Sequence, residues 1–127
     1  MQKGYFSFLM IFIVAAGAYY YLSPNCLKGN CKDGFGIKYL SGQYRYEGNF
    51  KNGLADGNGK LVLESGESYD GEWIRGNKEG TGTYIYMNGN RYVGSWKSNK
   101  PDGEGILYDL EGAVLYKGQW NAGNTVK

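Results

Sequence analysis

The sequence predicts an all-β fold, an extended single-layer twisted antiparallel sheet of stacked β-hairpins, preceded by an N-terminal hydrophobic helix. Two observations support the sheet. The pattern Tyr-x-Gly-x-(Phe/Trp) recurs at intervals of 23, 23 and 24 residues, starting at Tyr46, Tyr69, Tyr92 and Tyr116. Nearly all of the 22 glycines keep the same interval, and apolar and polar residues alternate within each unit. A repeat of this length is one supersecondary unit that packs on its neighbours in a linear stack.

Residues 1–22 form a separate hydrophobic segment. Residues 4–22 carry no charge, and as a helix they would span about 28 Å, close to the ~30 Å hydrocarbon thickness of a bilayer. The segment predicts a signal anchor, with Tyr19–Tyr21 at the membrane interface. The alternative is a signal peptide that is cleaved after Ala18, which secretes the remainder. Both interpretations place the repeat domain outside the cytoplasm.

Residues 23–33 are interpreted as a linker and a degenerate first repeat that contains the two cysteines of the chain, Cys26 and Cys31. In an exported domain such a pair forms a disulfide, and we expect it to tie down the first, incomplete repeat. A reactive redox pair is the alternative, although no histidine is present to activate a thiolate. A single Cys-x4-Cys pair without histidine is a poor zinc site.

The repeat domain is predicted at residues 34–127. It divides into full repeats near 46–68, 69–91 and 92–115, with partial repeats at 34–45 and 116–127. Within a repeat, the alternation at Tyr69–Trp73 predicts a half-buried strand, and a second strand follows at 80–86. The polar segment Ile74–Glu79 between them is expected to be a loop. Turns with glycine at positive φ are expected at Gly66, Gly89 and Gly112.

The recurring aromatic residues and glycines are expected to form the core. An aromatic ring can lie on a glycine of a neighbouring strand because no Cβ intervenes. Rows of rings then replace the core that a single-layer sheet cannot enclose, so Gly94→Val is expected to unfold the middle of the stack. We call these positions the aromatic–glycine lattice: Tyr46, Gly48, Phe50, Tyr69, Gly71, Trp73, Tyr92, Gly94, Trp96, Tyr116, Gly118 and Trp120.

The pattern Tyr-x-Gly-x-Trp-x-x-Gly-x-x-x-Gly-x-Gly at residues 69–82 resembles the MORN (membrane occupation and recognition nexus) repeat. The resemblance covers about residues 26–123, with Phe50 in place of tryptophan and Asn99 in place of a loop glycine. It implies a binding or scaffolding module, with phospholipid contact in some members and dimer-forming edges in others. Residues 26–36 resemble the cysteine-bearing first repeat of bacterial members. That implies a bacterial origin and a periplasmic or cell-surface location.

The composition argues against an enzyme and against a nucleic-acid-binding protein. The chain has no histidine, the usual general base and metal ligand, and its formal net charge is only +2. The carboxylates are expected on a solvated sheet face, since the repeat implies no cleft. The Gly-x-Gly pairs lack both a following helix and the Gly-Lys-Ser/Thr of a phosphate loop. We therefore expect no catalytic residue, no cofactor and no metal.

Three candidate interaction surfaces remain. Val62, Ile85 and Tyr108 recur every 23 residues and predict an apolar stripe on the face opposite the lattice. Beyond Trp120 we expect an open sheet edge that can pair with another copy. Both surfaces favour a scaffold that binds a protein partner or itself. The alternative is a peripheral module whose cationic loops contact acidic phospholipid headgroups through Lys51, Arg75, Lys97 and Lys100.

Overall fold

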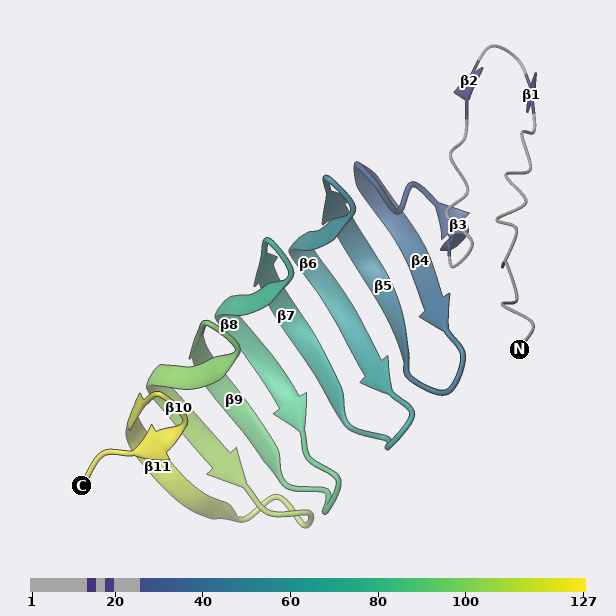
Figure 1. Ribbon diagram of the computed structural model, residues 1–127. Helices are drawn as coiled ribbons and strands as arrows, with labels where there is room; N and C mark the ends of the chain where they lie inside the picture. Colours follow the sequence, from purple (N-terminus) through teal and green to yellow (C-terminus); the bar gives the residue numbers. More distant parts are fainter. Residues whose placement is uncertain (1–13, 16–17, 20–25) are drawn as a thin grey trace, which may run out of the picture.

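The computed structural model describes residues 14–15, 18–19 and 26–127. Residues 26–127 form one open antiparallel sheet of ten strands, in which each strand pairs with its neighbours in sequence (Figure 1). This sequential order is that of a meander, and the sheet is a single layer. Its strands are β3 (Cys26–Gly29), β4 (Gly34–Leu40), β5 (Tyr44–Lys51), β6 (Leu54–Leu63), β7 (Ser68–Ile74), β8 (Asn77–Ile85), β9 (Arg91–Lys97), β10 (Lys100–Tyr108), β11 (Val114–Asn121) and β12 (Asn124–Thr125).

The N-terminal helix expected at residues 4–22 is not supported. Most of this segment lies outside the described residues, and the four residues that are described form strands β1 (Val14–Ala15) and β2 (Ala18–Tyr19), paired antiparallel. Across residues 14–15, 18–19 and 26–127, the structure contains no helix with the length and apolar character needed to cross a bilayer.

One long edge of the sheet consists of two-residue turns. Both central residues have positive φ, as in the type I′ turns that suit the twist of a hairpin. The turns and their φ values are Asn52–Gly53 (51°, 77°), Arg75–Gly76 (49°, 81°), Ser98–Asn99 (47°, 69°) and Ala122–Gly123 (48°, 88°). The loop expected at Ile74–Glu79 is therefore shorter than predicted, because β8 already begins at Asn77. The polar residues Asn77–Glu79 belong to a strand.

The opposite edge consists of wider turns with one left-handed glycine each. Gly66, Gly89 and Gly112 have φ of 91°, 86° and 91°, as the sequence predicted. Each donates its N–H to a carbonyl three residues earlier, on Leu63, Tyr86 and Asp109, at 2.9–3.1 Å. The two turn types alternate along the chain. The type I′ turns therefore lie on one edge of the sheet, and the wider turns with a left-handed glycine lie on the other.

The strands bend near the type I′ turns (Figure 1). The pairing register shifts there, between Gly48 and Phe50 in β5, between Gly71 and Trp73 in β7 and between Pro101 and Gly105 in β10. Such bulges bend a strand and increase its twist. We call the face that carries the aromatic–glycine lattice the inner face, and the other the outer face. All buried apolar residues of the sheet form one cluster with Cys26 and Cys31.

Candidate interaction surfaces

A row of glycines crosses the inner face of the sheet. Eight consecutive strands, β4 to β11, place a glycine opposite a glycine of the next strand: Gly36, Gly48, Gly59, Gly71, Gly82, Gly94, Gly105 and Gly118. A Cβ on Gly82 or Gly105 would lie 2.5 Å from Cζ of Tyr69 or Tyr92. The tyrosine rings therefore occupy the space that a side chain would need. This row explains why glycine stands inside strands that it would otherwise weaken.

The aromatic rings connect one repeat with the next. Tyr69 contacts Trp73 of its own repeat and Trp96 of the following one, with both centroid distances 5.0 Å and edge-to-face angles of 87° and 81°. The same two contacts recur around Tyr46 and Tyr92. Tyr69 and Tyr92 are 0% exposed. These rings are the core of the protein, and they are not available to a partner.

The polar atoms of the buried rings are all hydrogen-bonded. Each lattice tyrosine donates its hydroxyl to a carbonyl three residues later, at 2.8–3.0 Å. The indoles of Trp73, Trp96 and Trp120 donate Nε1–H to carbonyls of Gly59, Gly82 and Gly105 at 3.0, 3.1 and 3.3 Å. Burial raises the pKa of Tyr46 and Tyr92 to about 12, with smaller contributions from neighbouring acidic groups. Burial also raises the pKa of Tyr69.

A second repeating contact joins successive type I′ turns. The first residue of each turn donates its backbone N–H to a carboxylate of the preceding repeat at 3.0–3.2 Å: Asn52 to Asp33, Arg75 to Asp56, Ser98 to Glu79 and Ala122 to Asp102. The second residue of each turn donates to the carbonyl just before that carboxylate. We call these contacts the turn bridges. Sequence reasoning had assigned these acidic side chains to a solvated face, although their spacing repeats with the lattice.

Lys78 lies on the inner face among aromatic rings. Its ammonium is 5.8, 5.5 and 5.8 Å from the ring centroids of Tyr69, Tyr84 and Trp96. Burial lowers the pKa of Lys78, and the nearby carboxylate of Glu67 partly opposes this. The equivalent positions in the two neighbouring repeats are Ala55 and Pro101, which carry no charge and cannot make this cation–π contact.

The apolar stripe expected from Val62, Ile85 and Tyr108 is interrupted. The three residues do lie in one row of the outer face, but Ser68 stands between the first two and Arg91 between the last two. The Arg91 guanidinium covers the Tyr108 ring at 4.5 Å. Spacing in the sequence could not show this, because the intervening residues come from strands β7 and β9.

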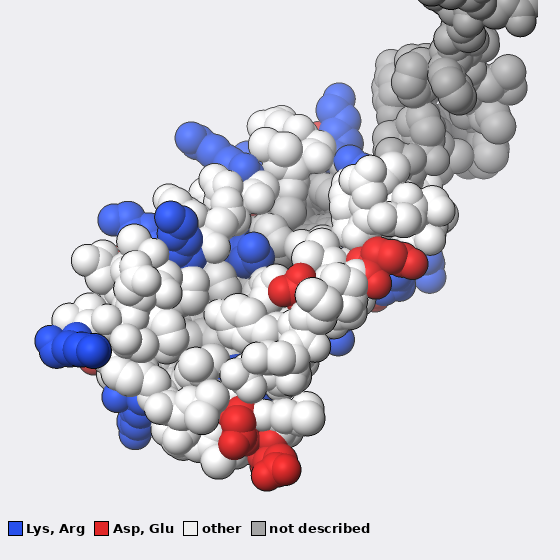
Figure 2. Space-filling view, turned by 60° about the horizontal axis from the view of Figure 1, so that its bottom comes forward, with Lys and Arg blue, Asp and Glu red and all other residues white. Residues whose placement is uncertain are grey.

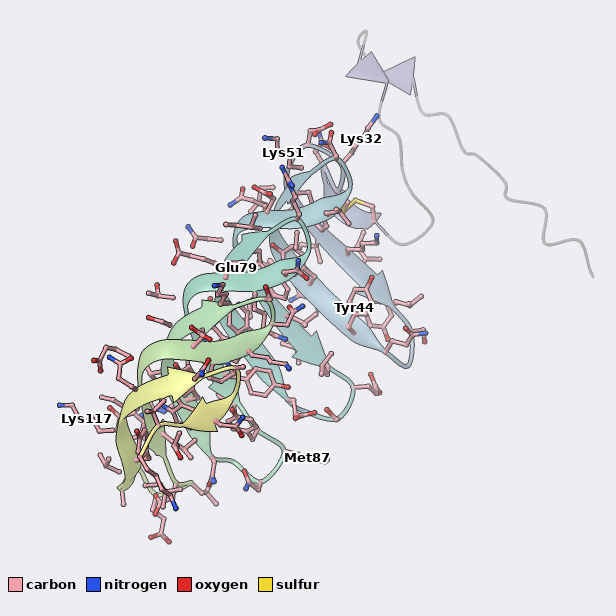
Figure 3. All side chains as sticks on the ribbon, turned by 60° about the vertical axis from the view of Figure 1, so that its left-hand side comes forward. Lys32, Tyr44, Lys51, Glu79, Met87 and Lys117 are labelled. Atoms are coloured by element: carbon pink, nitrogen blue, oxygen red, sulfur yellow. A yellow bond between two sulfur atoms is a disulfide. The ribbon has the colours of Figure 1, made fainter. Side chains whose placement is uncertain are left out.

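The four candidate lipid-contacting cations all lie along the type I′ edge. Lys51 and Lys97 end their strands, Arg75 lies in a turn and Lys100 begins β10, and all four are exposed. Figure 3 shows Lys51 at this edge and Met87 at the opposite one. Within residues 26–127 no ion pair joins these four cations to an acidic residue. On the face seen in Figure 2, basic side chains are spread along the domain and form no single patch.

The two ends of the sheet differ. At the N-terminal end, Cys26 and Cys31 form the predicted disulfide. A Cβ on Gly36 would lie 3.0 Å from Sγ of Cys31, so the disulfide covers the first glycine of the row. At the C-terminal end, β12 pairs only with Trp120 and Asn121 of β11. The stretch of β11 from Val114 to Gly118 has no strand on its second side among the described residues.

Among the described residues, no group of three or more Cys, Asp or Glu side chains is placed to hold a metal ion. The fold thus defines a class, a linear repeat protein of stacked β-hairpins whose rings form the core.

Comparison with protein families matches the MORN repeat to residues 46–68, 69–91 and 92–109, half of the chain. The protein belongs to the MORN repeat family. This family generally consists of non-enzymatic scaffolds and often takes part in protein or membrane interactions. No curated protein matches the sequence. The structure continues the same register beyond the matched residues, into β4 on one side and β11 on the other.

Proposed function

We propose that the protein is a non-enzymatic scaffold that binds a strand of a protein partner, or of a second copy, along the free side of β11. The observation that supports this is the unpaired stretch Val114–Gly118. A row of unpaired backbone groups at a sheet edge is a template for another strand. Val114 and Leu115 are 57% and 54% exposed beside this edge, which adds apolar surface to the backbone contacts.

The backbone groups available at this edge can be assigned. The carbonyl of Gln119 accepts the N–H of Val126, so the backbone groups of Gln119 face the free side of β11. Residues two apart in an antiparallel strand direct their backbone groups to the same side. The N–H and C=O of Lys117 therefore face the free side, whereas its side chain lies on the outer face.

Lys117→Pro tests the proposal, since it removes this N–H without removing a bond to β10. Proline is tolerated at a strand edge, so the fold should be retained. The full chain is studied in detergent under oxidising conditions, with light scattering that separates protein mass from detergent mass. We expect a concentration-dependent dimer for the natural chain and a monomer for Lys117→Pro. The matched control Lys117→Ala keeps the N–H and should still dimerise. Equal masses for the natural chain and Lys117→Pro would overturn self-association through β11.

In this proposal the hydrophobic residues 4–22 tether the scaffold to a membrane, with the repeat domain outside the cytoplasm, at the periplasm or cell surface of a bacterium. Cleavage after Ala18 would instead export it. Protease treatment of intact cells decides the side: digestion of the repeat domain without lysis supports the proposal, and protection until lysis contradicts it.

A second candidate function is contact with anionic phospholipid through Lys51, Arg75, Lys97 and Lys100. The turn bridges favour it, because they direct the neighbouring carboxylates to backbone N–H groups and leave these cations without ionic partners. Binding to vesicles that contain an anionic lipid should then weaken as salt is raised. Changing all four residues to glutamine should remove the salt-dependent part. Binding that is unchanged in this variant would contradict the candidate function.

A further inference from the structure

We infer that strand β4 is a second docking edge, shaped for β11 of another copy of this chain and covered in the oxidised protein by β3 and the Cys26–Cys31 disulfide. This inference rests on the proposed association through β11. It adds the partner surface, the register of the contact and the chemical step that exposes it.

The two ends of the sheet carry complementary halves of one repeat. Every interior repeat has a first strand with Tyr-x-Gly-x-(Phe/Trp) and a second strand with Gly-x-Gly, as in β7 and β8. Strand β11 is a first strand, with Tyr116, Gly118 and Trp120. Strand β4 is a second strand, with Gly34 and Gly36. Within the described residues, β11 lacks a full second strand and β4 lacks a first strand of the repeat type.

The interior pairs supply a template for joining these halves. In β5 and β6, Tyr46 lies opposite Leu61 and Gly48 opposite Gly59. The same relation holds in β9 and β10, where Tyr92 lies opposite Leu107 and Gly94 opposite Gly105.

Applied to the ends, the template places Tyr116 of one copy opposite Lys38 of the next and Gly118 opposite Gly36. The ring of Tyr116 then covers Gly36, as Tyr46 covers Gly59 within the chain. The contact would continue the glycine row without a break from one copy into the next.

In the oxidised chain, residues 26–31 occupy the side of β4 where β11 of another copy would pair, and we call them the N-terminal cap. Strand β3 pairs with β4 at Cys26–Lys38, Lys28–Ile37 and Gly29–Gly36, on the side where β11 of a second copy would lie. Sγ and the backbone N of Cys31 would both lie 3.0 Å from a Cβ on Gly36, where a tyrosine ring lies at Gly59 and Gly82. The disulfide-linked segment 26–31 and an incoming Tyr116 ring therefore exclude each other, and this segment must move away before β11 of another copy can pair.

The cap is small compared with the strand that would replace it. Strand β3 has four residues, its pairing is interrupted by a bulge, and Leu27 is 63% exposed. Within residues 26–31, the two cysteines are the buried side chains. Strand β11 has eight residues and brings the half-buried ring of Tyr116. Without the covalent link, β11 of another copy offers the larger apolar contact for the same edge.

A dithiol reductant removes the link by exchange. One thiolate of the reductant attacks a sulfur of the Cys26–Cys31 bond, and a mixed disulfide forms as the other cysteine leaves as a thiolate. The second thiol of the reductant resolves the mixed disulfide. Both cysteines end as thiols and the reductant as its own disulfide, so two electrons and two protons pass to the protein.

The two redox states should differ in the symmetry of their assembly. In the oxidised chain β3 covers β4, so association through β11 pairs like edges and closes at two copies. In the reduced chain β11 of one copy can pair with β4 of the next. This head-to-tail contact leaves a free edge at each end and therefore extends into chains. It is favoured over the like-edge pair because it restores the alignment of Tyr116 with a glycine-bearing second strand.

The test measures protein mass by light scattering on the full chain in detergent, before and after a dithiol reductant, over a range of concentrations. We expect reduction to raise the mass to at least three times that of the monomer, increasing with concentration and reversing on reoxidation. Lys117→Pro should block the increase and Lys117→Ala should not. The double variant Cys26→Ser/Cys31→Ser should form chains without reductant, and circular dichroism checks that it retains the sheet.

The outcomes separate this inference from the proposed function. A mass unchanged by reduction overturns the inference, even if the oxidised chain is a dimer that Lys117→Pro dissociates. An increase that Lys117→Pro does not block overturns it as well, because the contact then does not use β11. A further readout is a photo-crosslinking residue placed at Ile37. Crosslinks from Ile37 to β11 of another copy, formed only after reduction, support the head-to-tail contact, and their absence in the larger species overturns it.

Discussion

The inner and outer faces of the sheet are made by the same strands, yet the 23-residue repeat constrains them differently. On the inner face a tyrosine, a glycine and an aromatic residue recur in every repeat, and their rings and hydrogen bonds recur with them. On the outer face one row reads Glu47, Lys60, Asp70, Thr83, Val93 and Ile106. The inner positions must fit the next repeat, whereas the outer ones meet solvent. Substitutions on the two faces should therefore differ in cost.

The largest difference is expected between Gly94→Val and Val93→Ala, which are neighbours on opposite faces. A Cβ at Gly94 would lie 2.5 Å from the Glu104 carbonyl oxygen and from Cα of Gly105. Both atoms belong to the backbone, so the strands must separate, and we expect a loss of at least ~3 kcal/mol in the free energy of unfolding. Val93→Ala should cost less than ~1 kcal/mol. Urea titration followed by tryptophan fluorescence measures both. Equal midpoints would show that the glycine row does not determine stability.

Trp96→Ala should be nearly as damaging. The indole contacts Tyr69, Tyr84 and Tyr92 and donates to the Gly82 carbonyl. Removing a buried tryptophan ring costs about 3–5 kcal/mol. Tyr108→Ala, which removes an aromatic ring from the outer face, should cost about 1 kcal/mol. The melting temperatures of Trp96→Ala and Tyr108→Ala, measured by circular dichroism, test this difference. A larger shift for Tyr108→Ala would reverse the assignment of the two faces.

Alkaline pH should destabilise the inner face specifically. The pKa of Tyr46 and Tyr92 is about 12 in the folded chain, against about 10 in an unfolded one. The unfolded state therefore releases these protons first. The stability is fully present below pH ~10 and is lost as the pH rises through ~12. Melting temperatures measured from pH 8 to 12 should fall over this window. Tyr46→Phe/Tyr92→Phe should show a smaller fall, and an equal fall would assign the effect to other groups.

The smallest effect is expected at a turn bridge. Glu79→Ala removes the acceptor of the Ser98 N–H, and the loss should be about 1 kcal/mol, as for a helix cap. Ser98 has a φ of 47° without being glycine, so its turn depends on such support. Glu64→Ala at the opposite edge serves as control and should be nearly neutral. Hydrogen exchange of the Ser98 and Asn99 amides gives a local readout, and unchanged protection in Glu79→Ala would contradict the role.

Sequence patterns predicted the hairpins and the glycine turns, because both depend on residues that are close in sequence. Gly66, Gly89 and Gly112 required only local chemistry. The same reasoning predicted a loop over all of Ile74–Glu79, although β8 begins at Asn77. A polar segment is typical of an exposed strand as well as of a loop, so polarity could not distinguish the two. It also missed the turn bridges, where Glu79 and Ser98 lie 19 residues apart and meet only when two repeats stack. The interrupted outer stripe was missed for the same reason.

The sequence by itself determined that this chain is a linear stack of hairpins, because its period and its alternation of ring and glycine admit few other arrangements. It also indicated the disulfide through two cysteines beside an incomplete repeat. Only the tertiary structure decided which glycine each ring covers, which carboxylate supports each turn and what covers the two ends. Those features depend on the register between strands, which no single repeat contains. The position of the disulfide over Gly36, where a tyrosine would otherwise lie, became visible only when the strands were aligned.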